Sequence, residues 1–161
     1  MATPARISQI AVVVRDIEKS MKAYNELLGW GPWNVYEHVP PALHHTHLRG
    51  EPTQYTMLGA ETNVDGMGFE LIQPLDGPSI YREWLDKYGE GFHHIAVMKH
   101  TQQESELFKA EMSARGVNIL MDGRIGETIE FYYLDTVPAL KIIVESGSGH
   151  AIDLKPSWTF P

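Results

Sequence analysis

The sequence predicts an α+β domain built from two copies of one β-α-β-β-β unit. The first observation is an internal repeat, because residues 9–14 (QIAVVV) resemble residues 94–98 (HIAVM). Each of these runs precedes an amphipathic helical stretch that ends near a glycine, Gly29 in the first copy and Gly116 in the second. Each copy then closes with an apolar strand that contains a single glutamate. A repeat on this scale indicates a duplicated structural module.

The first copy contains recognisable signals for each of these elements. Residues 7–14 are β-rich and mostly apolar, as expected of a buried strand. Asp16 is a suitable N-cap for a helix over residues 17–28, where apolar residues recur at helical spacing and charged residues cover the other side. Two prolines open an expected loop at residues 40–50. The further strands of this copy are expected at residues 33–39, 55–61 and 67–73.

The second copy begins after a break in the pattern. Residues 74–78 (PLDGP) interrupt the chain, and Ser79 can cap a short helix over residues 80–88. A strand at 92–98 and a helix at 102–115 follow. The further strands of this copy are expected at residues 117–120, 130–134 and 140–145. We therefore divide the chain into a first module, a linker with a short helix, a second module and a C-terminal tail, at residues 6–75, 76–91, 92–146 and 147–161.

Length, charge and cysteine content restrict the class of protein. The chain has 161 residues, which fits one compact domain. With 13 basic and 21 acidic residues its formal charge is −8, which argues against binding to nucleic acid or to a membrane surface. The chain has no cysteine, so a metal site would use imidazole, carboxylate or amide ligands. Residues 1–6 do not resemble a signal peptide, and no apolar run approaches the roughly 18 residues of a membrane span, so we expect a cytoplasmic protein.

Four positions carry metal-ligand chemistry. Under the internal repeat Gln9 corresponds to His94, and Glu70 corresponds to Glu145. A duplicated module with one donor on its first strand and one on its last can bring four donors to a common axis, where they can hold a divalent ion. His93 is the weaker choice, because alternation along a strand places it on the opposite face from its neighbour. The alternative for each residue is an ordinary half-buried polar side chain, but a buried carboxylate without a cation is costly.

The chain resembles the vicinal oxygen chelate superfamily, which is built from paired βαβββ modules and includes glyoxalase I, methylmalonyl-CoA epimerase and extradiol dioxygenases. Residues 89–97 (GEGFHHIAV) are similar to the opening of the second module in methylmalonyl-CoA epimerases. Residues 69–75 (FELIQPL), with the short helix that follows, are similar to the linker of the same proteins. The resemblance covers nearly the whole chain, and it implies a U-shaped, mostly antiparallel sheet around a central metal site.

The resemblance also implies a ligand set. The metal positions of the family fall on Gln9, Glu70, His94 and Glu145. Gln9 departs from the epimerase-like pattern, in which a histidine opens the first strand, and it matches the animal-type glyoxalase I family instead. One imidazole and three oxygen donors suit Zn, Ni, Co, Mn or Mg with six ligands, some of them water or substrate.

The expected activity is that of a metal-dependent isomerase or epimerase that abstracts a proton next to a carbonyl and stabilises the resulting enolate. Glu145 or Glu70 could serve as the base, and Glu37 or His38 are candidates for a second base. The expected partner is a small-molecule substrate with a carbonyl, either a CoA thioester or a smaller or ring-shaped metabolite. Among the basic residues that could bind phosphate, the sequence offers Arg6, Arg49 and Lys99.

Homodimerisation is expected, with Trp158 and Phe160 of the tail covering either the interface or the cavity. Three other functions stay open. A glyoxalase I-like lyase would share the ligand set, and a small-molecule-sequestering protein would keep the cavity without the ligands. A ring-cleavage dioxygenase needs two histidines and one carboxylate, which Gln9 disfavours. The histidines within residues 44–47 either line the substrate entrance or are solvated.

Overall fold

The computed structural model describes residues 5–149 and 154–161. Residues 1–4, in the segment where no signal peptide is expected, and residues 150–153 of the predicted tail lie outside the described residues. The helices are α1 (Ile17–Leu28), α2 (Ile80–Tyr88), α3 (Gln102–Ala114) and α4 (Val137–Leu140). The strands are β1 (Gln9–Val13), β2 (Trp33–His38), β3 (Leu43–Leu48), β4 (Glu51–Pro52), β5 (Met57–Val64), β6 (Met67–Pro74), β7 (Gly91–Ala96), β8 (Ile119–Ile125), β9 (Ile129–Leu134), β10 (Ile143–Ser148) and β11 (Trp158–Phe160).

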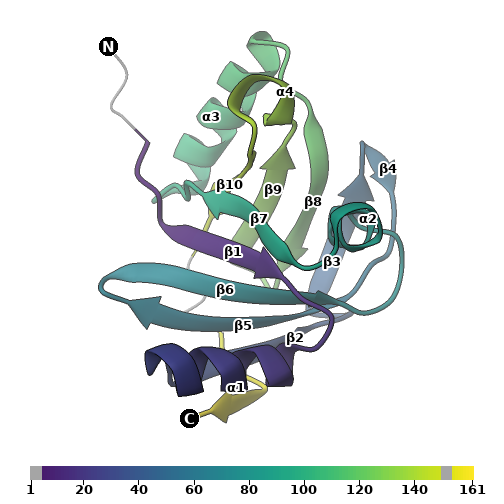
Figure 1. Ribbon diagram of the computed structural model, residues 1–161. Coiled ribbons are helices and arrows are strands. Elements are labelled where there is room, and N and C mark those ends of the chain that lie inside the picture. The colour runs from purple at the N-terminus through teal and green to yellow at the C-terminus, as the bar shows by residue number, and fades with distance from the viewer. Residues whose placement is uncertain (1–4, 150–153) are drawn as a thin grey trace.

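The described strands form one curved sheet of 11 strands in the order β11-β2-β5-β6-β1-β7-β10-β9-β8-β3-β4 (Figure 1). Its centre consists of two four-stranded groups, β2-β5-β6-β1 and β7-β10-β9-β8, which meet at the antiparallel pair of β1 and β7. In each group the first strand pairs in parallel with the last, β1 with β6 and β7 with β10, and the other pairs are antiparallel. The predicted α+β fold with a mostly antiparallel sheet is confirmed.

The expected loop at residues 40–50 is wrong. Residues 43–48 form β3, which crosses to the second half of the sheet and pairs antiparallel with β8. Leu43 is buried at 2% exposure in the core. A histidine-rich stretch behind two prolines lacks a local strand signal, and its pairing partner lies some eighty residues further along the chain, so only tertiary contacts make it a strand.

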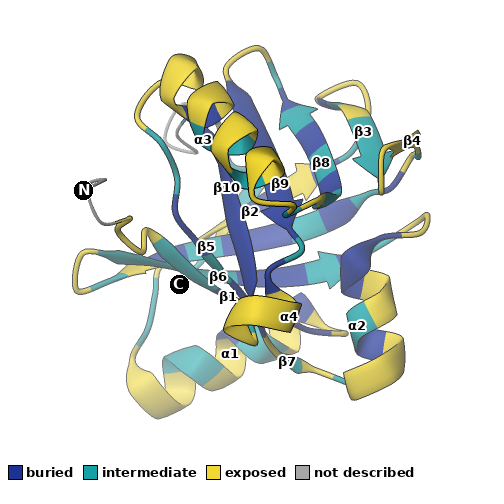
Figure 2. Ribbon diagram, turned by 90° about the horizontal axis from the view of Figure 1, so that it is seen from above, coloured by how far each residue is buried: buried dark blue, intermediate teal, exposed yellow. Residues whose placement is uncertain are grey.

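α1, α2 and α3 begin where the sequence predicts, whereas the short α4 was not predicted, and α1 and α3 lie on the outer side of the sheet. The Asp16 carboxylate accepts a hydrogen bond from the Lys19 backbone at the start of α1, and the Ser79 hydroxyl accepts one from the Arg82 backbone at the start of α2. α1 buries its apolar side against β2, β5 and β6, and α3 packs against the outer side of β9 and β10. Figure 2 shows that the remaining sides of both helices are exposed.

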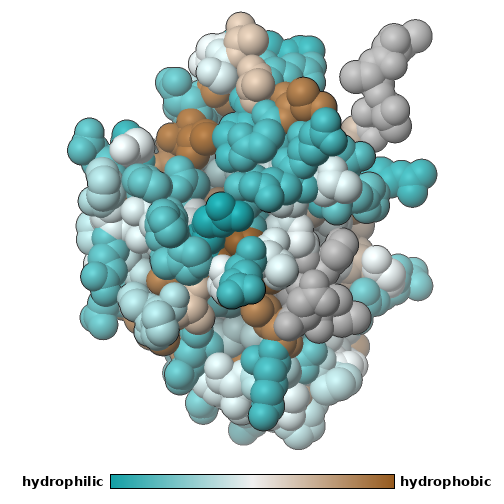
Figure 3. Space-filling view, turned by 180° about the vertical axis from the view of Figure 1, so that it is seen from behind, coloured by the Kyte–Doolittle hydropathy of each residue, from teal (hydrophilic) through white to brown (hydrophobic). Residues whose placement is uncertain are grey.

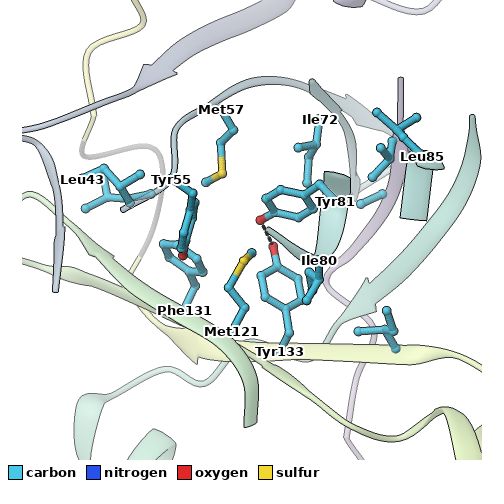
Figure 4. Close-up of a cluster of buried hydrophobic side chains, with 14 of the residues drawn as sticks. Leu43, Tyr55, Met57, Ile72, Ile80, Tyr81, Leu85, Met121, Phe131 and Tyr133 are labelled. Atoms are coloured by element: carbon cyan, nitrogen blue, oxygen red, sulfur yellow. Dashed lines mark hydrogen bonds between the residues drawn. The ribbon is translucent and has the colours of Figure 1, made fainter. Parts of the chain in front are cut away.

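The largest hydrophobic cluster lies inside the curve of the sheet and includes side chains from both halves, among them Tyr55, Met57, Tyr81 and Phe131 (Figure 4). Trp158 and Phe160 of the tail do not line the cavity. β11 pairs with β2, and Trp158 packs with Phe160 in the cluster under α1. These aromatic rings therefore cover the first module, and their place at a dimer interface stays a prediction. Within the described ranges, no helix is long and apolar enough to cross a membrane.

Candidate metal centre

Three of the predicted ligands converge where the two halves of the sheet meet. Glu70 of β6, His94 of β7 and Glu145 of β10 each offer one ligand atom, and these atoms lie within 4.8 Å of one another. The Nε2 atom of His94 is 3.0 Å from Oε2 of Glu145 and 3.8 Å from Oε2 of Glu70. All three side chains are at least largely buried, so the cluster is shielded from bulk water.

The register of the parallel strand pairs explains this convergence. Glu70 lies opposite Ala11 in the pair of β6 and β1, and Glu145 lies opposite Ala96 in the pair of β10 and β7. Each alanine follows the candidate ligand of its own strand by two residues, and residues two apart point to the same face of a sheet. The positions matched by the internal repeat of the sequence are therefore also equivalent in the sheet.

His94 is oriented in a way that suits a metal ligand. The side chain is fully buried, and its Nε2 atom has no hydrogen-bond partner among the described residues. Its Nδ1 atom lies 2.8 Å from Nδ1 of His93, so one of these two nitrogens carries the hydrogen. With that hydrogen on His94, the lone pair of Nε2 points toward the two glutamates. An unpartnered buried nitrogen beside two carboxylates is a fitting site for a divalent cation.

Gln9 lines the same cavity, and its side chain is hydrogen-bonded to Glu61. Because a carboxylate accepts, the amide nitrogen of Gln9 donates, and the amide oxygen remains available as a fourth ligand. Glu61 also lines the cavity, and it lies directly opposite Glu70 in the pair of β5 and β6. Glu61 was not among the residues predicted from the sequence, although its alternation with Met57 on one strand was a usable signal.

The carboxylates of this site are held close together in a poorly solvated place. Burial, and then the charges of Glu61 and Glu145, raise the pKa of Glu70 well above its usual range. Burial and then the charge of Glu145 raise the pKa of Glu61 to about 7, against the effect of the hydrogen bond from Gln9. Among the described residues, His94 alone lies within ion-pair distance of Glu70 and Glu145. The site is therefore short of positive charge, which a divalent ion would supply.

A cavity of about 300 Å³ opens at this cluster. This volume is at the lower end of the range for small-molecule sites. Part of its wall is apolar and is formed by Met57, Ile125, Ile129, Phe131 and Leu154, while polar side chains line the rest. Such a wall can exclude water while a few polar groups orient a ligand.

The two candidates for a second base lie on opposite faces of β2. His38 lines the cavity at 7% exposure, and burial lowers the pKa of its imidazole to about 4. Glu37 is exposed, because adjacent residues on a strand point to opposite faces. The expectation that Glu37 reaches the site is wrong.

The histidines of β3 take part in strand pairing. Nε2 of His44 lies 2.8 Å from the backbone oxygen of Gly126, and Nδ1 of His47 lies 2.7 Å from the carboxylate of Asp122 on β8. None of the three histidines lines the cavity. His44 and His47 link β3 to the second half of the sheet, whereas His45 is exposed, as the solvated alternative predicts.

Two tyrosines of the cavity wall were not predicted from the sequence either. Tyr81 of α2 and Tyr133 of β9 are buried, and their hydroxyl oxygens are 2.6 Å apart. Burial raises the pKa of both phenols well above the usual range, so both stay protonated. Tyr133 lies opposite Glu145 in the pair of β9 and β10, which only the strand register reveals.

Residues 8–133 match the family model of the Glyoxalase/Bleomycin resistance protein/Dioxygenase superfamily. The chain belongs to this superfamily. The predicted membership in the vicinal oxygen chelate superfamily is thereby confirmed. Members typically use a divalent metal ion, and the group of Glu70, His94 and Glu145 fits one. A search of curated proteins finds no match.

Several solved structures are similar to this superfamily member. A hypothetical protein from Bacillus halodurans matches with a TM-score of 0.65 and 19% identity over 92% of this chain and 96% of its own. Methylmalonyl-CoA epimerase from Mycobacterium tuberculosis matches with a TM-score of 0.62 and 18% identity over 93% of both chains. A variant of the Streptomyces coelicolor methylmalonyl-CoA epimerase in complex with 2-nitronate-propionyl-CoA matches with a TM-score of 0.59 and 22% identity over 92% of this chain and 100% of its own. At these identities the similarity concerns the fold.

Proposed function

We propose that this protein is a divalent-metal-dependent isomerase or epimerase that removes a proton next to the carbonyl of a small-molecule substrate. The observation that carries the proposal is the convergence of Glu70, His94 and Glu145 on one side of a cavity of about 300 Å³. A cavity of this size admits the reacting part of a metabolite, and the buried ligands provide the charge that such chemistry needs.

Gln9, Glu70, His94 and Glu145 would hold the ion, with Zn, Ni, Co, Mn and Mg as the candidates. When bound, the ion supplies positive charge that stabilises the negative charge developing on the substrate's carbonyl oxygen. The two carboxylates balance the charge of a divalent ion. The apolar wall of the cavity keeps bulk water out, which strengthens these electrostatic interactions.

Carboxylates of the cavity would take up and return the proton. Glu145 of β10 is the first candidate and Glu70 the second, because both lie at the reacting centre. Glu61 of β5, opposite Glu70, adds a further carboxylate, and as it lies outside the three-residue ligand group it need not leave an ion to act. Return of the proton to the opposite face of the same carbon gives epimerisation, and return to a neighbouring atom gives isomerisation.

The substrate would carry an anionic group as well as the carbonyl. Lys99 lines the cavity, and its ammonium group, which lies 3.8 Å from the centroid of the Phe108 ring, would have to turn to reach that group. Arg49, one of the expected phosphate partners, is already engaged, because its guanidinium donates to both carboxylate oxygens of Glu83 at 2.8 and 2.7 Å. One similar solved structure is a methylmalonyl-CoA epimerase in complex with methylmalonyl-CoA. That compound is a suitable first probe, and smaller carbonyl acids form the comparison set.

The proposal is tested by exchange of the substrate's acidic hydrogen with solvent. Protein loaded with each candidate ion in turn is incubated in deuterium oxide with methylmalonyl-CoA or a smaller carbonyl acid, and proton NMR follows the α-hydrogen. The wild type should catalyse exchange, and Glu145→Gln should lose at least about a hundredfold in rate if this residue is the base. Glu37→Gln is the matched control, because this glutamate is exposed outside the cavity, and its rate should equal that of the wild type.

Other results would point to the alternative functions. Consumption of oxygen during turnover would replace the isomerase by a dioxygenase. Turnover of the adduct of glutathione with an α-ketoaldehyde would indicate a glyoxalase I-like lyase. Absence of any exchange by the loaded protein across the whole probe set, together with tight binding of an unchanged small molecule, would indicate a sequestering protein.

A further inference from the structure

Two tyrosine hydroxyls meet in the wall of the cavity. Tyr81 comes from the linker helix α2 and Tyr133 from β9, and the two oxygens are 2.6 Å apart (Figure 4). Their side chains are 0% and 2% exposed, and both residues line the cavity. This pair joins the linker to the second half of the sheet at the place where a ligand would lie.

One hydrogen of this pair has no acceptor. Each hydroxyl carries a single hydrogen, and one of the two lies between the oxygens. Whichever tyrosine donates, the other keeps a hydrogen, and among the described residues neither oxygen has another hydrogen-bond partner. Other buried tyrosines are satisfied: Tyr55 donates to the backbone oxygen of Asp122 at 2.7 Å, and Tyr132 donates to that of Ser105 at 3.2 Å. A buried donor without an acceptor is costly, so the spare hydrogen indicates a site for an acceptor that enters the cavity.

The position of the pair identifies which part of a ligand it would meet. Tyr133 lies opposite Glu145 in the pair of β9 and β10, and its ring centroid is 4.9 Å from that of His94. The hydroxyl pair and the candidate metal ligands therefore border the same small space. An oxygen of a ligand held at the metal site would lie within reach of the hydroxyls, whereas the two glutamates would repel an anion if no cation were present.

We propose that the Tyr133 hydroxyl, supported by Tyr81, donates a hydrogen bond to an anionic oxygen of the substrate, such as a carboxylate or enolate oxygen. Tyr133 is the donor to the ligand because it is the member of the pair beside Glu145 and His94. Tyr81 then donates to Tyr133 and polarises it, since hydrogen bonds in a chain strengthen one another. This role rests on the proposed function, because an ion held by Glu70, His94 and Glu145 would bring the ligand to this place.

Binding of oxalate tests the role without turnover. Oxalate is a planar dianion with adjacent oxygens, and it is titrated calorimetrically into Mn²⁺-loaded protein whose ion content is checked by elemental analysis. Tyr133→Phe should bind oxalate about ten- to a hundredfold more weakly, the effect of losing a hydrogen bond to a charged group. Tyr81→Phe should weaken it only about two- to threefold, since Tyr133 still donates. Tyr132→Phe is the matched control, because its hydroxyl is used elsewhere, and its affinity should be unchanged. All three variants should retain the ion.

The possible failures are distinguishable. A wild type that binds no divalent ion would overturn the proposed function and this role with it. A loaded wild type that takes up no oxalate, or a loaded Tyr133→Phe that binds it as tightly as the wild type, would overturn only the tyrosine role. The ultraviolet difference spectrum of tyrosine, recorded as oxalate is added to the wild type, provides a second measurement. Binding of oxalate without a tyrosine signal would contradict the role even if a variant failed to fold.

Discussion

Replacing Glu61 with glutamine should stabilise the metal-free protein, and by more at high pH than at low pH. Burial and then the charge of Glu145 raise the pKa of Glu61 from 4.5 to about 7. A pKa that is higher in the folded state than in the unfolded state means that the folded state binds the proton more tightly. The ionised carboxylate therefore destabilises the fold. This cost is absent below about pH 4.5 and is complete above about pH 7.

The size of the effect follows from the pKa difference, which is 7 − 4.5, or about 2.5 units. At 1.36 kcal/mol for each unit, the full cost is about 3 kcal/mol. The linkage relation gives nearly the full cost at pH 8 and roughly 1 kcal/mol at pH 5. Glutamine has nearly the same size and can still accept the hydrogen bond from Gln9, but it carries no charge. In a domain of 161 residues, 3 kcal/mol corresponds to roughly 6–12 °C in Tm.

Urea denaturation at pH 8 and pH 5, with a chelator present, measures these free energies of unfolding. Glu37→Gln is the control, since this residue is an exposed glutamate on the neighbouring strand, and it should change the free energy by no more than about 0.5 kcal/mol at either pH. A saturating divalent ion should narrow the difference between Glu61→Gln and the wild type, because the ion offsets the carboxylate charge. An equal increment at both pH values, or a loss of stability at pH 8, would refute the reasoning.

Three further predictions concern the metal, the pH dependence of stability and the assembly. His94→Ala removes the only nitrogen donor and should lose stoichiometric ion binding; elemental analysis that finds one ion per chain in this variant would exclude His94 as a ligand. Burial lowers the pKa of His38 from 6.5 to about 4, so the folded state disfavours the protonated imidazole. The contribution of neutral His38 to stability is therefore complete above about pH 6.5 and is lost as the pH falls toward 4. Between pH 7 and pH 4 the wild type should therefore lose about 3 kcal/mol more than His38→Gln in urea denaturation, and identical acid sensitivity of the two proteins would rule this out. Sedimentation at micromolar concentration should give a homodimer of the 18.2 kDa chain, and a clean monomer would contradict this prediction. Hydrophobic side chains form only small separate patches on the back face (Figure 3), so the dimer interface should lie on another face.

The sequence alone determined the duplicated plan of the fold and the positions that converge at its centre. Hydrophobic periodicity and helix caps are local signals, so α1 and α2 could be placed correctly from a few neighbouring residues such as Asp16 and Ser79. The internal repeat carried more than local information. Because the same module occurs twice, matching Gln9 with His94 and Glu70 with Glu145 indicated equivalent places in the sheet before any strand pairing was known.

The tertiary structure alone decided which side chains share the cavity with those positions. Residues 43–48 form a strand only because β8, far along the chain, offers it a partner. His38 faces the cavity and Glu37 does not, and this depends on which face of β2 packs against α1. Glu61 and the pair of Tyr81 and Tyr133 approach the ligands through strand register and the docking of α2. Pairing between distant strands depends on the packing of the whole sheet, and a shift of one residue would turn each of these strand side chains to the other face.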